Sequence, residues 1–262
     1  MVMKIENYET WKSGIDLDTF TFPHNPSSFD NQVSSNHTIT AIPYSEHHII
    51  ISGGGHSPIT YVLQGFFDGD QKWTNYRNLA KHIHETDKLK KLYFESDKFA
   101  VVIGKDIKRT HSGGRTNFID YVATLESPIE ILFGDTLKDN SVEAETNDGD
   151  VTTFIEKITG TVTDGNQDIV LSDAIGNRIK IDSSHLTTGH NIVMRLLTFT
   201  KGTTNIYKTK YCYVLDTSTG AELTTITTGF GVLKLAAGAS TSTISISNLS
   251  SPVIYFRDGY SV

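Results

Sequence analysis

The chain has 262 residues, of which 37% are hydrophobic and 20% charged, and its formal net charge is −7. These proportions are those of an ordinary globular protein with room for one large or two smaller domains, and they exclude a disordered chain. The acidic balance argues against a protein that reads a specific nucleic-acid sequence, because such a protein carries an excess of basic residues. The single cysteine, Cys212, excludes an intramolecular disulfide framework.

The N-terminal residues 1–18 read MVMKIENYETWKSGIDLD and lack the basic and then apolar pattern of a signal peptide. No apolar run approaches the roughly 18 residues that cross a bilayer. We therefore expect a protein without membrane insertion that is made and assembled in a cytoplasm.

Two glycine-rich stretches each carry a histidine and a serine: SGGGHS at 52–57 and HSGGR at 111–115. A phosphate-binding loop needs a helix directly after it, but Pro58 and then strand-like residues follow the first stretch. Alternating apolar residues on both sides of the second stretch predict strands there too. We predict that both stretches are hairpin connections in which glycine supplies a positive φ, and a phosphate cradle or active-site loop is the alternative.

Residues 68–91 break the β pattern. Asp70 is a candidate N-cap, and an apolar stripe recurs at helical spacing, formed by Trp73, Tyr76, Ala80 and Ile83. Lysines gather at the C-terminal end, where the helix dipole favours cations. This predicts one helix near 71–86 lying against a sheet, with a basic contact for nucleic acid as the alternative.

Residues 140–150 read NSVEAETNDGD, an acidic stretch without an apolar face, and we place the domain boundary in this stretch or just before it. Beyond it, short strand-like runs alternate with turn sequences such as TDGN, IGNR, TKGTTN and DTSTG. The sequence therefore predicts a mainly β protein with two domains. Residues 1–140 form a β-sheet or sandwich with one flanking helix, and residues 141–262 form a β-sandwich.

Motifs for catalysis or metal binding are missing. His82 and His84 are two apart on the predicted helix and point to different faces, as do the adjacent histidines at 47–48 on a predicted strand. There is no HExxH, CxxC or nucleophile elbow. The NDGD at 147–150 begins like a calcium loop, but Thr159 stands where the bidentate Glu is needed. We expect no enzyme activity, no metal and no cofactor; a pair of glycosidase carboxylates is the one chemistry that the sequence leaves open.

The order of several segments is similar to the N-terminal domain of the distal tail proteins of tailed viruses. These segments are FTFPHNPSSF at 20–29, the strand–SGGG–strand unit, FFDGDQKWTNYRNLAKHI at 66–83, LKKLYFESDKFAVVIG at 89–104 and FIDYVATLESPIEILFG at 118–134. The last residues, LAAGASTSTISISNLSSPVIYFRDGYSV at 235–262, resemble the closing pattern of that family. The chain departs from the pattern at Ala237, where a proline is expected, and in its long acidic linker.

The resemblance implies a virion structural protein of the viral tail, assembled in the host cytoplasm. Members of this family form six-fold rings through the N-terminal domain at the junction of tail tube and tail tip or baseplate. Their C-terminal domain is galectin-like or oligosaccharide-binding-like. The implied partners are other copies of the chain in a homohexamer, the tail tube protein, and tail hub or tip proteins. The two glycine-rich stretches then become candidate subunit contacts through Gly53, Gly54, Gly55, His56, Gly113, Gly114 and Arg115.

Two other functions stay open at this stage. One is a carbohydrate-binding adhesin that contacts a cell-surface glycan through the Thr-rich C-terminal domain. The other is a different baseplate or tail-hub component with peptidoglycan chemistry, for which the sequence offers no acid–base or metal motif.

Overall fold

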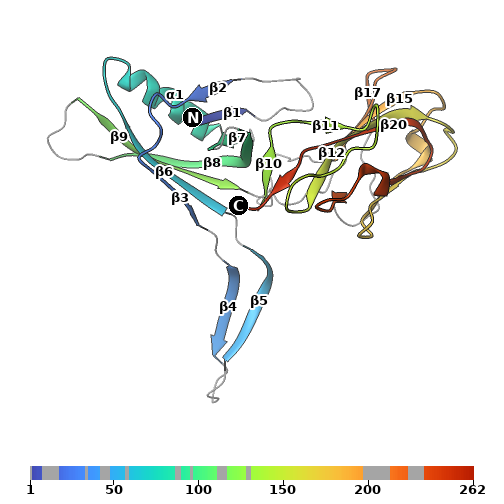
Figure 1. Cartoon of the computed structure of the whole chain (residues 1–262), viewed down its shortest axis with the longest axis horizontal. Helices are drawn as coiled ribbons and strands as arrows, with labels where there is room; N and C mark the ends of the chain where they lie inside the picture. Colours follow the sequence, from blue (N-terminus) through green and yellow to red (C-terminus); the bar gives the residue numbers. More distant parts are fainter. Residues whose placement is uncertain are drawn as a thin grey trace. The chain divides into compact units, whose positions relative to one another are not determined.

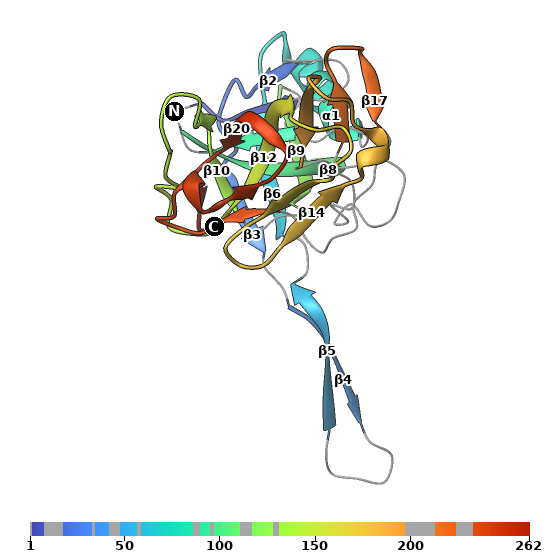
Figure 2. The same ribbon diagram turned by 90° about the vertical axis from the view of Figure 1, so that its right-hand side faces the viewer.

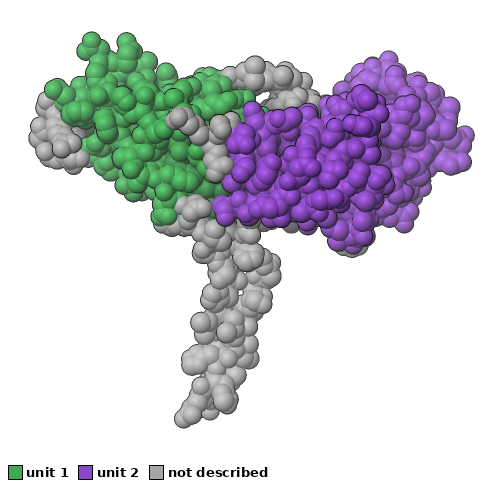
Figure 3. Space-filling view, in the orientation of Figure 1, with its two compact units in different colours: residues 1–9, 15–94, 100–130 green, residues 10–14, 95–99, 131–262 purple. Residues whose placement is uncertain are grey.

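The computed structural model describes residues 2–7, 18–32, 35–41, 48–56, 59–85, 90–94, 97–110, 117–127, 131–196, 213–223 and 233–262. These residues form a mainly β protein with one α-helix, as predicted (Figure 1). The chain divides into two compact units, coloured separately in Figure 3. Unit 1 comprises residues 1–9, 15–94 and 100–130, and unit 2 comprises residues 10–14, 95–99 and 131–262. None of the described helices has the length and apolarity that crossing a membrane requires.

The main sheet of unit 1 has the strand order β2-β1-β7-β8-β9-β6-β3. Its strands are β1 (Lys4–Asn7), β2 (Thr19–Thr21), β3 (Ser28–Gln32), β6 (Ile59–Phe67), β7 (Lys90–Tyr93), β8 (Lys98–Thr110) and β9 (Ile119–Ser127). The period-2 pattern explains the central strands, since every second residue of β9 is buried from Ile119 onward. β6 pairs antiparallel with β9 on one side and with β3 on the other.

Helix α1 (Lys72–His84) covers the buried face of this sheet. Leu79 and Ile83 are fully buried, and a Cβ on Gly104 of β8 would lie 2.0 Å from the Ile83 carbonyl oxygen. Only glycine allows the last turn of α1 to approach the sheet so closely.

The structure corrects two details of the predicted helix. The N-cap is Gln71 without a side-chain cap bond, not Asp70, and Trp73 is 44% exposed. Of the predicted stripe, Ile83 is buried and Tyr76 and Ala80 are half-buried, and the other buried residues of α1 are Leu79 and His82.

Strands β4 (Ser35–Ala41) and β5 (His48–His56) pair antiparallel in a two-stranded sheet of their own (Figures 1 and 2). The prediction that residues 52–57 turn the chain is wrong for Ser52 to His56, which belong to β5. His56 lies opposite Ser35 and Ser52 opposite His37, so the three glycines between them face a single residue. Glycine here accommodates a bulge within a strand, not a reversal of the chain.

The second glycine-rich stretch, 111–116, lies outside the described residues. The strands on either side of it are β8 and β9, which pair antiparallel up to Thr110 and Asp120. The sequence predicted two strands at these positions, and both are observed.

Unit 2 contains two sheets around one aliphatic core, the arrangement of a β-sandwich. The larger sheet has the order β11 (Lys138–Asp139), β20 (Leu249–Phe256), β12 (Thr153–Val162), β15 (Asn191–Arg195), β16 (Tyr213–Asp216), β17 (Ala221–Leu223), and β18 (Lys234–Leu235) also pairs with β12. The smaller sheet has the order β14 (Arg178–Ile181), β13 (Ile169–Ser172), β19 (Ser245–Ile246). β10 (Leu132–Gly134) pairs with β21 (Gly259–Tyr260), and short 3₁₀ helices span Ser183–His185 and Thr241–Thr243.

The two units divide between residues 130 and 131, whereas the sequence placed the boundary between 140 and 141. Residues 140–150 therefore belong to unit 2 in the structure. Asn147, in the middle of this acidic stretch, is fully buried. A polar stretch without an apolar face was interpreted as a linker, but its polar side chains are hydrogen-bonding partners of the surrounding backbone.

Candidate functional site

The residues that the structure describes contain no group of three histidine, cysteine or acidic side chains close enough to hold a metal ion. His82 is buried and His84 is exposed, so the two lie on different faces of α1. The acidic groups of the NDGD stretch are engaged in other contacts: Asp148 pairs with Lys138, and Asp150 accepts hydrogen bonds from Ser261. Other features of these residues are a two-stranded ribbon, an open sheet edge and several exposed aromatic side chains.

The β4–β5 ribbon carries the first set of candidate contact residues, Gly53, Gly54, Gly55 and His56. It continues a pair of strands at the edge of the unit 1 sheet: β4 follows β3 and β5 precedes β6 along the chain. The register runs from Ser28 opposite Gln64 to Gln32 opposite Thr60, and resumes with Ser35 opposite His56. With seven residues, β4 extends the pairing by about 24 Å at ~3.4 Å per residue.

β3 is the last strand of the sheet among the described residues, so one side of its backbone faces no described strand. An edge of this kind is a template for pairing with a strand of another chain. The second set of candidate contact residues, Gly113, Gly114 and Arg115, lies outside the described residues. The structure therefore does not bring the two sets together in one site.

Exposed aromatic side chains lie at the end of unit 1 where Thr110 of β8 pairs with Asp120 of β9. Phe66 is 38% exposed, stacks on His24 with ring centroids 5.8 Å apart, and meets Phe118 edge-on at 5.4 Å. On the side of the helix, the Arg109 guanidinium lies 5.5 Å from the ring centre of the exposed Trp73. Aromatic residues and arginine are enriched in protein–protein interfaces, so these side chains are candidate contacts.

These aromatic residues were not among the contacts predicted from the sequence. One pattern could have revealed Phe66: it is followed directly by Phe67 at the end of an alternating strand. Adjacent residues of a strand point to opposite faces, so one of the two had to point away from the core. Trp73 was assigned to the buried stripe because spacing alone does not say which line of a helix meets the sheet.

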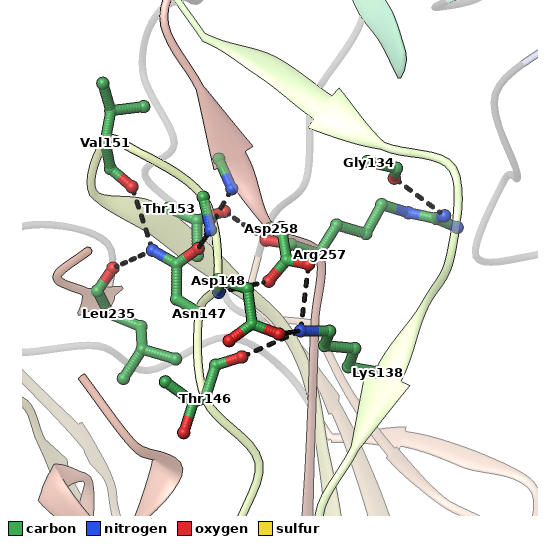
Figure 4. A network of polar contacts seen from close by, with 12 residues as sticks. Gly134, Lys138, Thr146, Asn147, Asp148, Val151, Thr153, Leu235, Arg257 and Asp258 are labelled. Atoms are coloured by element: carbon green, nitrogen blue, oxygen red, sulfur yellow. Dashed lines mark hydrogen bonds and ion pairs between the residues drawn. The ribbon is translucent and has the colours of Figure 1, made fainter. Parts of the chain in front are cut away.

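A network of polar contacts joins the segment around residue 147 to the last residues of unit 2 (Figure 4). The Asn147 amide donates to the carbonyl oxygens of Val151, Leu235 and Ala236, and its own oxygen accepts from the backbone N–H groups of Gly149 and Gly259. One buried side chain thus satisfies five backbone groups from three parts of the chain. A Cβ on Gly149 would lie 1.8 Å from the Gly259 carbonyl oxygen, so this contact requires glycine.

Lys138 lies beside this network. Its ammonium donates to the Thr146 carbonyl oxygen at 2.9 Å and pairs with Asp148 at 2.6 Å and Asp258 at 2.9 Å. Burial disfavours the ammonium, but hydrogen bonds to Asp148 and Asp258 outweigh this cost and raise the pKa of Lys138. Because these groups satisfy one another, the network holds the chain together and offers no reactive group.

Arg257 adds a second link in the same region. Its guanidinium lies 3.2 Å from a carboxylate oxygen of Glu156 and donates to the carbonyl oxygens of Gly134 and Asp135. The guanidinium also lies 5.4 Å from the ring centre of Phe99. Arg257 directly follows β20 and is only 8% exposed. Its contacts therefore join the end of β20 to the start of unit 2 and to β12.

No protein-family model and no curated protein sequence matches the chain. Solved structures do match its fold. The Dit protein (gp 19.1) of phage SPP1 is similar with a TM-score of 0.50 and 11% identity, over 89% of this chain and 92% of that one. A chain of the phage p2 baseplate, solved in its activated conformation with Sr, is similar with a TM-score of 0.53 and 10% identity, over 98% and 97% of the two chains. At such low identity the likeness establishes a shared fold, and it extends over nearly the whole chain.

Proposed function

We propose that this chain is a structural component of a phage tail or baseplate. More specifically, we propose that it is a distal tail protein whose copies form a six-fold ring where the tail tube meets the tail tip. The observation that carries the proposal is the fold shared along nearly the full length with the phage p2 baseplate chain and with the SPP1 Dit protein. The SPP1 protein is described as a paradigm of the hub adsorption apparatus in phages that infect Gram-positive bacteria.

The edge of unit 1 supports this proposal. A closed ring of identical chains needs two different complementary patches on each subunit, which meet head to tail. The open edge of β3 together with the β4–β5 ribbon offers one patch. The exposed aromatic side chains near Phe66 and Trp73 offer a second patch. We propose that both act in assembly, with tail tube and hub proteins as the further partners and with no catalytic role.

Glycan binding through unit 2 stays a prediction of the sequence. Sugars stack on open aromatic faces, but Tyr255 has the Lys157 ammonium 3.7 Å from its ring centre, and Tyr260 has that of Lys98 at 4.3 Å. Neither ring offers an open face on that side, so these two tyrosines do not favour glycan binding over assembly.

The proposal is tested by measuring the mass of the full-length protein by light scattering, with and without a shortened β4–β5 ribbon. In one variant, Asn-Gly replaces residues 38–51, which lie between the paired positions His37 and Ser52, to close a short type I′ hairpin. The matched control is Val142→Ser, because Val142 is 95% exposed on unit 2.

We expect the unaltered chain and the control to form an oligomer of six copies, and the shortened ribbon to shift the mass toward smaller species. An unchanged oligomer after shortening of the ribbon would contradict the proposed contact. Loss of the oligomer in Val142→Ser would instead place the contact on unit 2.

A further inference from the structure

A cluster of ionisable side chains lies at the corner of unit 1 where the last turn of α1 meets β1, β2 and β7. α1 contacts β2, and both views of the ribbon show them side by side (Figures 1 and 2). His82 is at the centre of this corner with only 3% of its surface exposed, and its ring centre lies 6.1 Å from that of Phe20 on β2. None of the groups in this cluster has a part in the proposed assembly contacts.

The two ring nitrogens of His82 are poorly paired. Nε2 lies 3.7 Å from a carboxylate oxygen of Asp18, which is longer than a hydrogen bond. Nδ1 is buried without a hydrogen-bond partner. This site accommodates a neutral imidazole at a lower free-energy cost than an imidazolium, because both nitrogens of the charged ring are donors that need acceptors.

The neighbours of His82 are already balanced in charge. Lys90 of β7 is fully buried and donates to Asn7 of β1 at 2.9 Å and to Glu85 at 3.4 Å. Lys81 pairs with Asp18 at 3.0 Å and lies 4.0 Å from Glu85. Among these described groups, two cations therefore meet two carboxylates while His82 is neutral, and a proton on His82 leaves one positive charge in excess.

Burial is the largest effect on His82 and lowers its pKa, and the positive charges of Lys90 and Lys81 act in the same direction. Asp18 and Glu85 act in the opposite direction but do not outweigh burial. The C-terminal end of α1 also favours a cation, and this contribution is smaller than the cost of burying the charge.

We propose that His82 is a protonation-sensitive latch, which holds β2 against the last turn of α1 while it is neutral and releases β2 when it takes up a proton. β2 is an end strand of the sheet and pairs only with β1 among the described strands. Its release would uncover the outer edge of β1, so the latch controls whether that edge can pair with another chain.

The direction of the pH dependence follows from linkage. In the released state His82 is solvated and has an ordinary pKa near 6.5, while in the closed state its pKa is lower. The released state therefore binds more protons once the pH falls below about 6.5, and the opening equilibrium rises by up to about tenfold per pH unit. The rise ends when the pH falls below the pKa of the closed state.

Hydrogen exchange of the full-length protein at pH 7.5, 6.5 and 5.5 tests the latch, with rates corrected for the intrinsic pH dependence of exchange. In the unaltered protein we expect the protection of residues 18–22 and 79–85 to fall several-fold, and at most about tenfold, between pH 6.5 and 5.5. β9 should keep its protection over the same range. His82→Gln, which carries no titrating ring, should remove the difference, and the control His84→Gln, on the exposed side of α1, should retain it.

An NMR titration of the His82 ring in the unaltered protein provides a second measurement that does not depend on the folding of a variant. A pKa for His82 clearly below 6.5 supports the latch. A value at or above 6.5, or equal pH profiles for the unaltered protein and a folded His82→Gln variant, would overturn it.

Discussion

The two units of this chain build their cores from different side chains. In unit 1 the core is rich in packed aromatic rings: Phe67 and Tyr121 stack with their ring centres 4.7 Å apart, and Phe20 meets Phe22 edge-on at 5.0 Å. In unit 2 the main buried cluster of the described residues is aliphatic, with Phe256 as its one aromatic member, and the stacked rings of Phe99 and Phe133 lie outside this cluster.

The units also differ in the polar groups that they bury. In unit 2, buried aspartate side chains accept hydrogen bonds from backbone N–H groups. Asp173 accepts from Ile175, Asn177 and Lys234. Asp216 accepts from Ser218 and pairs with His190. Unit 1 instead encloses His82, whose pKa is lowered by burial, beside the buried Lys90. Acid should therefore act on the two units through different groups, and in unit 2 the stability should depend on polar contacts between segments far apart in the sequence.

The largest effect should come from removing the end of the chain. β20 lies between β11 and β12 in the larger sheet of unit 2 and contributes Ile254 and Phe256 to the core. A chain that ends at Asn248 should therefore lose the cooperative unfolding of unit 2, because a central strand is missing. Circular dichroism and calorimetry would show this as the loss of one transition. A truncated chain with an unchanged unit 2 transition would contradict the dependence on distant segments.

A second large effect is expected at Asn147. Asn147→Ala removes an amide that serves five backbone groups, and it leaves buried N–H and C=O groups without partners. We expect a loss of about 3 kcal/mol in the free energy of unfolding of unit 2, measured by urea denaturation. The control Asn166→Ala, at an exposed turn, should change it by less than about 1 kcal/mol. Equal losses in the two variants would show that burial of Asn147 contributes nothing.

Gly104 provides the corresponding test in unit 1. Gly104→Ala places a Cβ 2.0 Å from the Ile83 carbonyl oxygen and must push α1 away from the sheet, at a cost of about 1–3 kcal/mol. Gly160→Ala in β12 is the matched control, because its Cβ would meet no atom nearer than 3.4 Å. Denaturant unfolding should show the larger loss for Gly104→Ala. A neutral Gly104→Ala would mean that α1 can shift without cost.

The smallest effect should come from the aspartates of unit 2. Asp216 is 5% exposed; burial would raise its pKa, but hydrogen bonds from His190, Thr219 and Ser218 outweigh this and lower it. A depressed carboxyl pKa contributes stability above the unfolded value of about 3.9, and this stability is lost as the pH falls through the folded pKa. Asp216→Asn should therefore cost about 1 kcal/mol at pH 7 and much less near pH 3. A cost that is the same at both pH values would contradict the assignment to the ionised carboxyl.

Local patterns predicted much of the fold. Alternation along 119–127 and helical spacing along 72–84 indicated β9 and α1, because each depends on neighbours in the sequence. The position of the three glycines within β5 could not be predicted, since glycine serves bulges and turns alike. The burial of Asn147 could not be predicted for another reason: three of its five backbone partners lie 88 to 112 residues further along the chain.

The candidate site was predictable only in part. The resemblance pointed to an assembling tail protein, and the structure has the fold of such proteins along nearly the whole chain. The exposed positions of Phe66 and Trp73 depended on which face of the sheet α1 covers. That choice is made by tertiary packing and leaves no trace in the spacing of the residues.

Electron microscopy of the purified full-length protein tests the central claim most directly. We predict class averages of a closed ring of six copies of the 29.0-kDa chain, with unit 1 forming the ring and unit 2 outside it. An oligomer whose subunits meet through unit 2, with the β3 edge and the β4–β5 ribbon outside every contact, would contradict it.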